Sequence, residues 1–226
     1  MTYTKDTILE VFKELGKEQF REIYKNHGYD NAIYGVSMAD LKNLQREIKT
    51  DTNLALELWE TGSLEARILA ILILNPDDVV EEMINDWLDE MKFPMLIDIF
   101  ITNIINKTPY REYLSEKWIN SEEENISRAG WQLMALIAMH QKNLPDLYFE
   151  KFLGLIEKNI HKSKNRCKDA MNNALIGIGL RNDKLEKKAF EVASKIGKIE
   201  VDYGDTSCKT PDATEYIKKA KARRKK

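Results

Sequence analysis

Apolar residues recur three and four positions apart along almost the whole chain, and no convincing run of strict alternation occurs before residue 196. Spacing of three and four places apolar side chains on one face of an α-helix, whereas alternation would indicate a strand. The pattern therefore predicts a nearly all-α protein. The predicted helices cover residues 4–15, 17–27, 37–49, 52–60, 63–74, 77–90, 94–106, 110–119, 123–139, 145–160, 164–180, 183–196 and 211–223.

Residues that cap or open helices stand between these segments. Ser37 is a suitable N-cap for the third helix, and Asn75-Pro76-Asp77 is expected to open the helix over 77–90. Pro109 and Thr210-Pro211-Asp212 are placed to start the helices over 110–119 and 211–223. The two longer irregular pieces are 28–35 and 198–209, and the latter offers Ile199 and Val201 as a short strand or an extended arm.

Residues 58–74 and 117–138 share a plan, in which a Trp ends one helix and Ala and Arg stand side by side near the start of the next, apolar helix. Residues 160–180 are a looser third copy. Helix pairs that repeat at about 40 residues indicate an α-solenoid, whose second helices line a concave face suited to a long partner. We expect one solenoid of 12–13 helices over residues 1–210, followed by a C-terminal helix and basic tail over 211–226.

The composition narrows the class of protein. Among 226 residues, 43% are hydrophobic and 32% charged, which is too apolar for disorder and too charged for a membrane protein. No apolar run approaches the roughly 20 residues that span a bilayer, and the N-terminus lacks the pattern of a signal peptide. We expect a cytoplasmic monomer. Two cysteines, Cys167 and Cys208, and three scattered histidines provide neither a disulfide framework nor metal-ligand spacing, so no cofactor is expected.

The net charge of −2 conceals an asymmetry along the chain. Residues 1–150 hold 15 Lys and Arg against 27 Asp and Glu, whereas residues 151–226 hold 20 against 10. The C-terminal third, with its tail Lys218–Lys226, is therefore expected to face an anionic partner, the concave face forming a basic groove. Two groups of cations are either exposed helix surface or phosphate ligands: Lys158, Lys162, Lys164, Arg166 and Lys168, and the smaller group Lys42, Arg46 and Lys49.

Asp98 lies within the apolar stretch FPMLIDIFITNII, residues 93–105. A carboxylate removed from water costs several kcal/mol unless it is paired or put to use. Asp98 is therefore either a structural group, paired with Arg67 or Arg128 or capping a helix, or a functional carboxylate.

Six stretches in order carry a resemblance to a known family: YKNHG (24–28), YGVSMADLKNLQREI (34–48), ARILA, IDIF, SRA (127–129) and LIGIGLRN (175–182). The chain resembles the bacterial HEAT-repeat DNA alkylation repair proteins, the AlkD-like alkylpurine DNA glycosylases. The resemblance implies a HEAT-like solenoid that wraps double-stranded DNA and hydrolyses the N-glycosidic bond of cationic N3- or N7-alkylpurines without extruding the base.

The resemblance also implies roles for particular residues. Asp98 matches the catalytic aspartate, which stabilises the oxocarbenium character of the deoxyribose and orients water. Arg128 matches an arginine that binds a backbone phosphate near the lesion, and Arg67 is a further phosphate candidate. The family's two sugar-contacting tryptophans correspond here to Phe93-Pro94 and Ile178; Phe93 offers one aromatic face, and Ile178 none. Trp131, three residues after Arg128, is either a substitute aromatic or a core tryptophan.

Three functions follow from these observations. The chain is a DNA alkylation repair protein with glycosylase activity, a non-catalytic DNA-binding relative that recognises damaged or branched duplex, or a helical scaffold for another protein. The absent tryptophans favour the second, and the acidic first two-thirds of the chain favours the third. Release of alkylated base by wild type, and its loss in Asp98→Asn, would distinguish the glycosylase from the other two functions.

Overall fold

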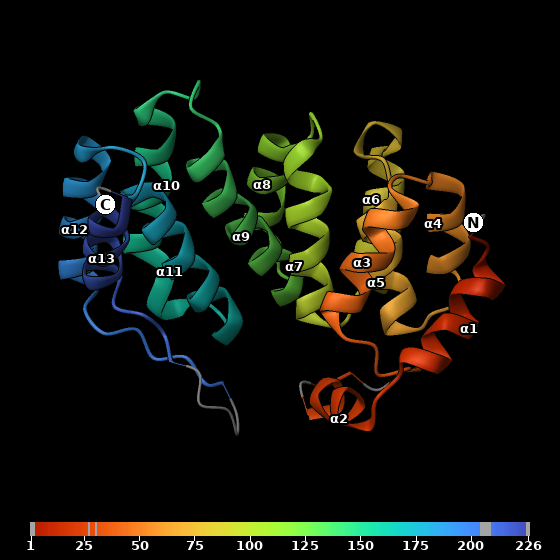
Figure 1. Ribbon diagram of the computed structural model, residues 1–226. Helices are drawn as coiled ribbons and strands as arrows, with labels where there is room; N and C mark the ends of the chain where they lie inside the picture. Colours follow the sequence, from red (N-terminus) through yellow and green to blue (C-terminus); the bar gives the residue numbers. More distant parts are fainter. Residues whose placement is uncertain (1–2, 27, 30, 204–208, 225–226) are drawn as a thin grey trace. The chain divides into compact units, whose positions relative to one another are not determined.

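The computed structural model describes residues 3–26, 28, 29, 31–203 and 209–224, and throughout this part of the chain the regular structure is helical (Figure 1). The chain divides into two compact units, unit 1 (Met1–Thr108) and unit 2 (Pro109–Lys226). The all-α class predicted from the periodicity is confirmed. The predicted extent of one domain over 1–210 stays a prediction.

Unit 1 is built of seven α-helices within its described residues. They are α1 (Lys5–Leu15), α2 (Glu18–Asn26), α3 (Met38–Ile48), α4 (Thr52–Trp59), α5 (Leu64–Ile73), α6 (Glu81–Glu90) and α7 (Pro94–Asn103), with 3₁₀ turns at Pro76–Asp78 and Ile105–Lys107. Helix α5 packs against its pair partner α4 and against both α3 and α7. The helices α3, α5 and α7 therefore form one layer, which we call the second-helix layer of unit 1.

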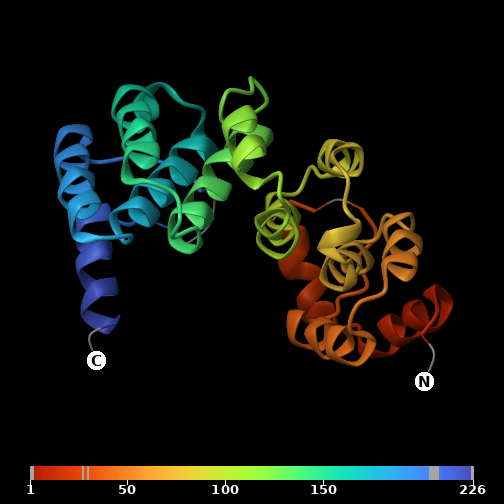
Figure 2. The same ribbon diagram turned by 90° about the horizontal axis from the view of Figure 1, so that it is seen from above.

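Unit 2 repeats this plan. Its helices are α8 (Arg111–Ile119), α9 (Glu124–His140), α10 (Asp146–Asn159), α11 (Asn165–Gly179), α12 (Asp183–Ile196) and α13 (Ala213–Arg224), with a 3₁₀ turn at Ile160–Lys162. Helix α11 lies between α9 and α13, and α10 packs against α12 (Figures 1 and 2). The helices α9, α11 and α13 form the second-helix layer of unit 2. The sequence repeat predicts α9 and α11 in this layer, and the structure adds α13.

Two glycines explain how closely the helices of unit 2 approach. A Cβ atom on Gly130 of α9 would stand 2.5 Å from the backbone nitrogen of Ile119 at the end of α8, and one on Gly177 of α11 would stand 2.9 Å from the carbonyl oxygen of Ala135 in α9. Distances under 3 Å are not tolerated between such atoms, so only glycine permits this approach. Ser115 Oγ, on α8, also donates to the Gly130 carbonyl at 2.9 Å.

Most predicted helix boundaries hold within two residues. Ser37 accepts a hydrogen bond from the Asp40 backbone N–H, and Asp212 accepts one from Glu215 at the start of α13. The helix predicted to begin at residue 77 begins at Glu81, because Asn75 caps the 3₁₀ turn instead. The helix predicted to reach residue 106 ends at Asn103 and continues as a second 3₁₀ turn.

The segment that contains Ile199 and Val201 is an extended arm between α12 and α13, without strand pairing among its described residues. Helix α13 packs against α11 and α12, so the C-terminal helix is part of unit 2. Cys167 is buried, as predicted, whereas His27, Cys208 and the last two lysines of the tail lie outside the described residues. Among the helices that the structure describes, each is too short or too polar to cross a membrane.

Candidate nucleic-acid interface

Asp98 lies on the more open side of α7. Leu96, Ile97, Phe100 and Ile101 are buried, while Asp98 is half-buried on a stripe with Met95, Ile99 and Thr102. Residues three and four apart share one helix face, so this stripe is the side of α7 turned away from the core of unit 1. The Oδ1 oxygen of Asp98 is shielded from solvent. The carboxylate therefore stands at the boundary of the core.

Phe93, immediately before α7, is a packing residue. Its side chain is only 5% exposed, and its ring lies edge to face against Tyr29, with centroids 5.3 Å apart. Tyr29 is held in turn by a hydrogen bond from its hydroxyl to the Gly62 carbonyl at 3.1 Å. Contact between Phe93 and a sugar would require this packing to open, and its role in DNA binding stays a prediction. Ile178 is fully buried within α11.

Arg67, on α5, is engaged inside unit 1. Its guanidinium pairs with Glu90, lies 4.6 Å from the ring centroid of Trp59 and donates through Nε to the Trp59 carbonyl at 3.4 Å. Trp59 also donates from Nε1 to Glu90 at 3.2 Å and stacks on Trp87 with centroids 3.8 Å apart. A DNA phosphate at Arg67 would have to compete with the Glu90 carboxylate.

Glu65, two residues before Arg67, is a buried charge that no sequence motif singles out. Its carboxylate is fully buried and accepts three backbone N–H groups, from Tyr34 at 3.0 Å, Gly35 at 2.6 Å and Val36 at 3.2 Å. Gly35 adopts a φ of 86°, a conformation that glycine adopts without strain and that turns these N–H groups toward one point. Glu65 therefore fixes the segment before α3, and its role is structural.

The smaller predicted cation group lies on the exposed surface of α3. Lys42, Arg46 and Lys49 are all exposed, and Arg46 donates to the Lys42 carbonyl at 3.2 Å and to Asn43. Lys42 and Arg46 are four positions apart and share one side of the helix, whereas Lys49 is the C-cap residue that follows it. A phosphate could reach them without displacing a carboxylate.

Arg128 and Trp131 lie in the first half of α9, on the second-helix layer of unit 2. Arg128 is 8% exposed and Trp131 4%. The Trp131 ring packs edge to face against Phe152 of α10, with centroids 6.3 Å apart, and lines a cavity of about 350 Å³ beside the start of α11. Trp131 is therefore a core tryptophan between repeats in this structure. Asp98 belongs to unit 1 and Arg128 to unit 2, and their predicted cooperation stays a prediction.

The N-terminal turn of α11 carries the cations that are best placed for an anionic partner. Lys164 is exposed and donates from Nζ to the Glu122 carbonyl at 2.5 Å, and Lys168 is half-buried one turn later. The guanidinium of Arg166 lies 5.6 Å from the ring centroid of Tyr203, an arrangement that orients it through a cation–π interaction. These cations add to the partial positive charge of the helix N-terminus.

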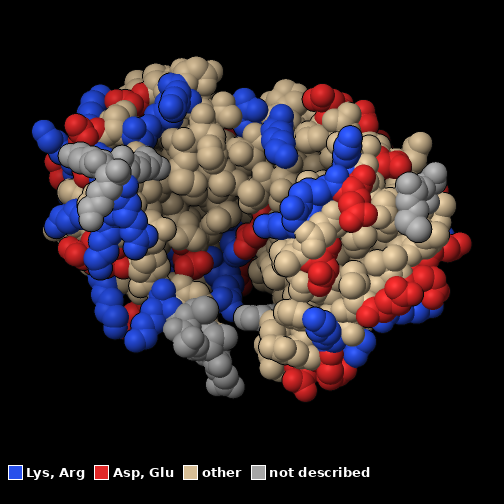
Figure 3. Space-filling view, in the orientation of Figure 1, with Lys and Arg blue, Asp and Glu red and all other residues tan. Residues whose placement is uncertain are grey.

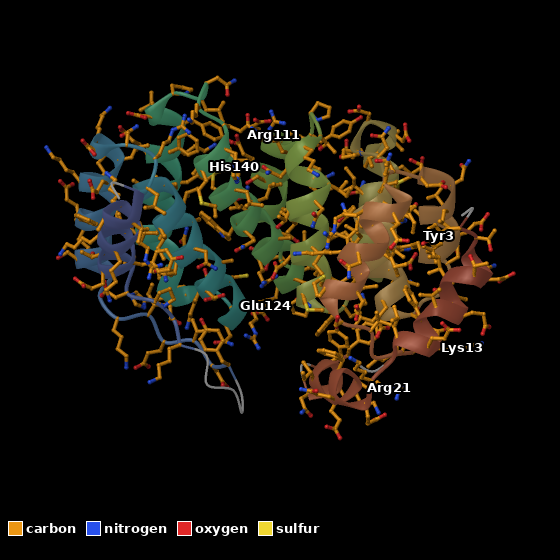
Figure 4. The ribbon with its side chains drawn as sticks, in the orientation of Figure 1. Tyr3, Lys13, Arg21, Arg111, Glu124 and His140 are labelled. Carbon is orange, nitrogen blue, oxygen red and sulfur yellow. The ribbon has the colours of Figure 1, made fainter. Side chains whose placement is uncertain are left out.

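Glu124, the first residue of α9, places a carboxylate at this same point (Figure 4). Its Oε1 accepts the backbone N–H of Arg166 at 2.7 Å, and its carbonyl accepts the Cys167 thiol at 3.4 Å. The carboxylate thus occupies a position on α11 that a phosphate oxygen could take. Burial raises the pKa of the Cys167 thiol, which keeps it protonated and unreactive near neutral pH.

The two units differ in their formal charge. Unit 1 holds 11 Lys and Arg against 20 Asp and Glu, and unit 2 holds 24 against 17. Figure 3 shows Lys and Arg side chains over the region of unit 2 formed by α12 and α13, and Asp and Glu side chains around α1. Nowhere in the described part of the chain do three or more His, Cys, Asp or Glu side chains gather closely enough to hold a metal ion.

Comparison with known proteins agrees with this architecture. Two uncharacterized Listeria proteins are similar to this chain. The Listeria innocua protein is 34% identical over 207 residues, which cover 89% of this chain and 90% of the relative. The Listeria monocytogenes protein is 32% identical over 209 residues, which cover 90% of this chain and 91% of the relative.

A solved structure superimposes with a TM-score of 0.88 at 28% sequence identity, and the match covers 98% of this chain and 95% of the other. It is described as a new family of proteins related to the HEAT-like repeat DNA glycosylases with affinity for branched DNA structures. The HEAT-like helical fold predicted from the repeat is thereby confirmed.

A family model described as DNA alkylation repair enzyme matches residues 8–217, which include every helix from α2 to α12. This match covers most of the chain and spans both units. The chain therefore belongs to the DNA alkylation repair enzyme family.

Proposed function

We propose that this protein binds double-stranded DNA through the second-helix layers of its units, and that it recognises duplex that is damaged or branched. The observation that carries the proposal is the group of cations at the start of α11, Lys164, Arg166 and Lys168, on a unit with excess positive charge. The affinity for branched DNA described for the similar structure supports the same partner. Phosphate contacts supply most non-specific affinity for DNA and make it fall with salt.

The binding test compares one DNA sequence as a plain duplex and as a branched junction, by fluorescence anisotropy at several salt concentrations. Wild type is expected to bind both, the junction more tightly. The triple variant Lys164→Ala, Arg166→Ala, Lys168→Ala should bind more weakly, and its logarithmic salt slope should be shallower by about 0.9 for each phosphate that it no longer neutralises. The control removes three cations elsewhere in unit 2, with Lys117→Ala, Lys142→Ala and Lys151→Ala.

Absence of DNA binding by wild type at low salt would contradict the proposal and leave the protein-binding scaffold as the remaining function. Equal weakening by the two triple variants would show that net charge, rather than the start of α11, determines the affinity.

A second candidate function is hydrolysis of the N-glycosidic bond of cationic N3- or N7-alkylpurines, with Asp98 as the catalytic carboxylate. The position of Asp98 at the open side of α7 favours it, because a partly shielded carboxylate interacts more strongly with a cationic sugar than one in open water. The leaving base already carries a positive charge, so a single carboxylate suffices and no general acid is required. Arg128 would hold a backbone phosphate near the lesion.

The test for this candidate measures release of 7-methylguanine and 3-methyladenine from alkylated DNA by chromatography. Wild type is expected to release base, and Asp98→Asn should lower the rate about a hundredfold or more. Asp86→Asn, at an exposed position of α6, is the matched control and should retain the wild-type rate. Tight DNA binding by wild type without base release would remove the glycosylase function and leave the binding function intact.

A further inference from the structure

Helix α13 of unit 2 is fixed in place along its inner side. Ala213 and Ile217 are buried, and Asn172 of α11 donates from Nδ2 to the Pro211 carbonyl at 2.9 Å, shortly before α13 begins. A Cβ atom on Gly179, at the end of α11, would stand 2.5 Å from Ile217 Cδ1, so the two helices lie in close contact. The outer side of α13 is therefore presented in a defined orientation.

Two cations of α13 have carboxylate partners inside unit 2. Lys221 pairs with Asp183 at 2.8 Å and with Glu186 at 2.7 Å, and both carboxylates belong to α12. Lys218 pairs with Glu215, one turn earlier on α13 itself, at 3.6 Å. The charges of these two lysines are therefore compensated within the unit.

Tyr216, Lys219 and Arg223 form a stripe on a different side of α13, which we call the α13 stripe. The three residues are three and four positions apart and share one helix face. Lys219 and Arg223 each stand two positions from Lys221, a rotation of about 200° in a helix of 3.6 residues per turn. The stripe is therefore turned away from α12. All three side chains are exposed, that of Tyr216 by 50%.

The two cations of the α13 stripe keep their charge for a partner. Throughout the described part of the chain, neither Lys219 nor Arg223 has a carboxylate within ion-pair distance. Glu215, four positions before Lys219, is paired with Lys218 instead. Asp212, one turn before the stripe begins, serves as the N-cap and accepts the Glu215 N–H at 2.8 Å. An aromatic ring and two uncompensated cations thus stand in line on open surface.

The α13 stripe belongs to the same helix layer as the cations at the start of α11, but it lies far from them along that layer. Helices α11 and α13 are neighbours in the second-helix layer of unit 2, and Ile217 of α13 lies against Gly179 at the end of α11. The 15 residues of α11, at a rise of 1.5 Å each, separate its two ends by about 20 Å. The two groups of cations can therefore contact different parts of one substrate.

The residue types of the stripe indicate the chemical class of that partner. Cations attract the phosphates of any nucleic acid, whereas an exposed aromatic ring adds a stacking surface where the face of a base is open. Neighbouring base pairs cover both faces of a base inside a duplex, but the bases of an unpaired strand can be splayed out. Stacking on an aromatic side chain also tolerates any sequence, because every base has a π-face. An aromatic ring in line with two cations thus suits a single strand.

We propose that the α13 stripe binds an unpaired strand of DNA, with Tyr216 stacked on a base and with Lys219 and Arg223 on the backbone phosphates. This inference rests on the proposed DNA-binding function and names what distinguishes a branched substrate from a plain duplex, since strands separate at a branch. The start of α11 holds the duplex, and the α13 stripe holds the strand that leaves it.

The experiment uses two DNAs that share one duplex sequence. One has blunt ends, and the other carries a single-stranded thymidine arm at one end. The full chain is titrated against each at several salt concentrations, and fluorescence anisotropy is read from a dye at the opposite end of the duplex. A third probe is the thymidine arm alone. Wild type is expected to bind the arm-bearing DNA about tenfold more tightly than the blunt duplex, as one stacked base provides.

Two variants remove the parts of the stripe separately. Tyr216→Ala should weaken binding of the arm-bearing DNA about tenfold, to the affinity of the blunt duplex, whereas Tyr216→Phe keeps the ring and should bind as wild type. Lys219→Ala combined with Arg223→Ala should make the logarithmic salt slope for this DNA shallower by about 0.7 for each single-strand phosphate no longer neutralised. Neither variant should alter the affinity for the blunt duplex.

Matched controls lie elsewhere in unit 2. Tyr113→Ala removes a tyrosine of α8 that is 55% exposed and has Lys117 at 5.5 Å from its ring centroid, so it tests an aromatic ring beside a cation outside the second-helix layer. Lys142→Ala combined with Lys187→Ala removes two exposed cations outside α13. Both control variants should retain the preference for the arm-bearing DNA.

The outcomes separate this inference from the proposed function. Equal affinity of wild type for both DNAs, or a preference that Tyr216→Ala retains, would overturn the strand assignment and leave duplex binding intact. Equal weakening of both DNAs by the stripe variants would make α13 a duplex contact and would also overturn it. Binding of the thymidine arm alone that Tyr216→Ala abolishes, without affinity for the blunt duplex, would support the stripe and contradict the proposed function. Absence of binding to all three probes would overturn both.

Discussion

The region around Arg67 in unit 1 and the start of α11 in unit 2 present cations on corresponding second helices, yet the two regions are used differently. Arg67 is enclosed by Trp59 and the Glu90 carboxylate, and two residues earlier Glu65 is satisfied by three backbone N–H groups. At the start of α11, by contrast, Lys164 donates to a backbone carbonyl and Arg166 lies over an aromatic ring.

This difference has a physical cause. A carboxylate that already neutralises an arginine must be displaced before a phosphate can bind, whereas a carbonyl or an aromatic face orients a cation and leaves its charge uncompensated. Arg67 and Glu65 therefore serve the stability of unit 1, whereas the cations at the start of α11 are available to a partner. The overall charge of the units, negative in unit 1 and positive in unit 2, follows the same division.

The largest expected effect concerns the internal charge of unit 1. Glu65→Ala removes the acceptor of three buried N–H groups and should lower the free energy of unfolding by about 3–5 kcal/mol. Urea denaturation followed by circular dichroism measures the change. Glu122→Ala, at an exposed position of unit 2, should stay within about 0.5 kcal/mol of wild type. Similar stabilities of the two variants would contradict the structural role of Glu65.

The next effect compares the cations of the two units directly. The triple variant Lys164→Ala, Arg166→Ala, Lys168→Ala should bind duplex DNA at least about tenfold more weakly than wild type, since each cation that neutralises a phosphate contributes substantially at low salt. The variant Lys42→Ala, Arg46→Ala, Lys49→Ala should be weakened less, because α3 belongs to the acidic unit. Anisotropy titrations at matched salt decide the order, and a larger weakening in the α3 variant would reverse the comparison.

A smaller effect follows from the carboxylates beside each cation. Glu124→Gln removes a negative charge from the start of α11 and should raise DNA affinity about two- to fivefold, the range expected for a charge at a helix terminus. Glu90→Gln removes the charged partner of Arg67 but leaves Arg67 against Trp59, so affinity should change little. An equal gain in both variants would show that Arg67 is as accessible to DNA as α11.

The smallest effect is a pH dependence of stability. Burial, followed by the hydrogen bond to Asp169, raises the pKa of Tyr203 from about 10 to about 12. The folded state holds the Tyr203 proton more tightly than the unfolded state does. The resulting contribution to the free energy of unfolding is therefore complete below pH 10 and disappears as the pH rises toward 12. Unfolding free energies measured between about pH 9 and pH 12 should fall less steeply for Tyr203→Phe than for wild type, whereas Tyr216→Phe, at an exposed site, should leave the slope unchanged.

Helical periodicity was enough to predict the helices and their pairing, because apolar spacing records which face of each helix is buried. The N-caps at Ser37 and Asp212 could also be predicted from the sequence, since capping is a local interaction within four residues. The helix start at Glu81 was missed because Asn75 caps the 3₁₀ turn Pro76–Asp78, while Val80, before α6, makes no side-chain capping bond that would mark the start.

Aromatic residues were harder to place. Phe93 and Trp131 qualify by type for contact with a sugar, but both are buried against other rings, Tyr29 and Phe152, that lie far away in the sequence. Glu65 and Asn172 were missed for the same reason, because their partners at residues 34–36 and 211 are brought to them only by folding. A glutamate or asparagine in an apolar helix is the signal that could have found them, as it found Asp98.

The amino-acid sequence by itself determined the all-α class, the repeat of helix pairs, the charge difference along the chain and the family resemblance, since each depends on short-range pattern or composition. Only the tertiary structure decided which charges are neutralised internally and which remain for a partner. Arg67 and Arg166 look alike in the sequence, and what separates them is Glu90 beside one and Tyr203 beside the other. Such pairings are long-range, set by how the helices pack rather than by the spacing of residues within them.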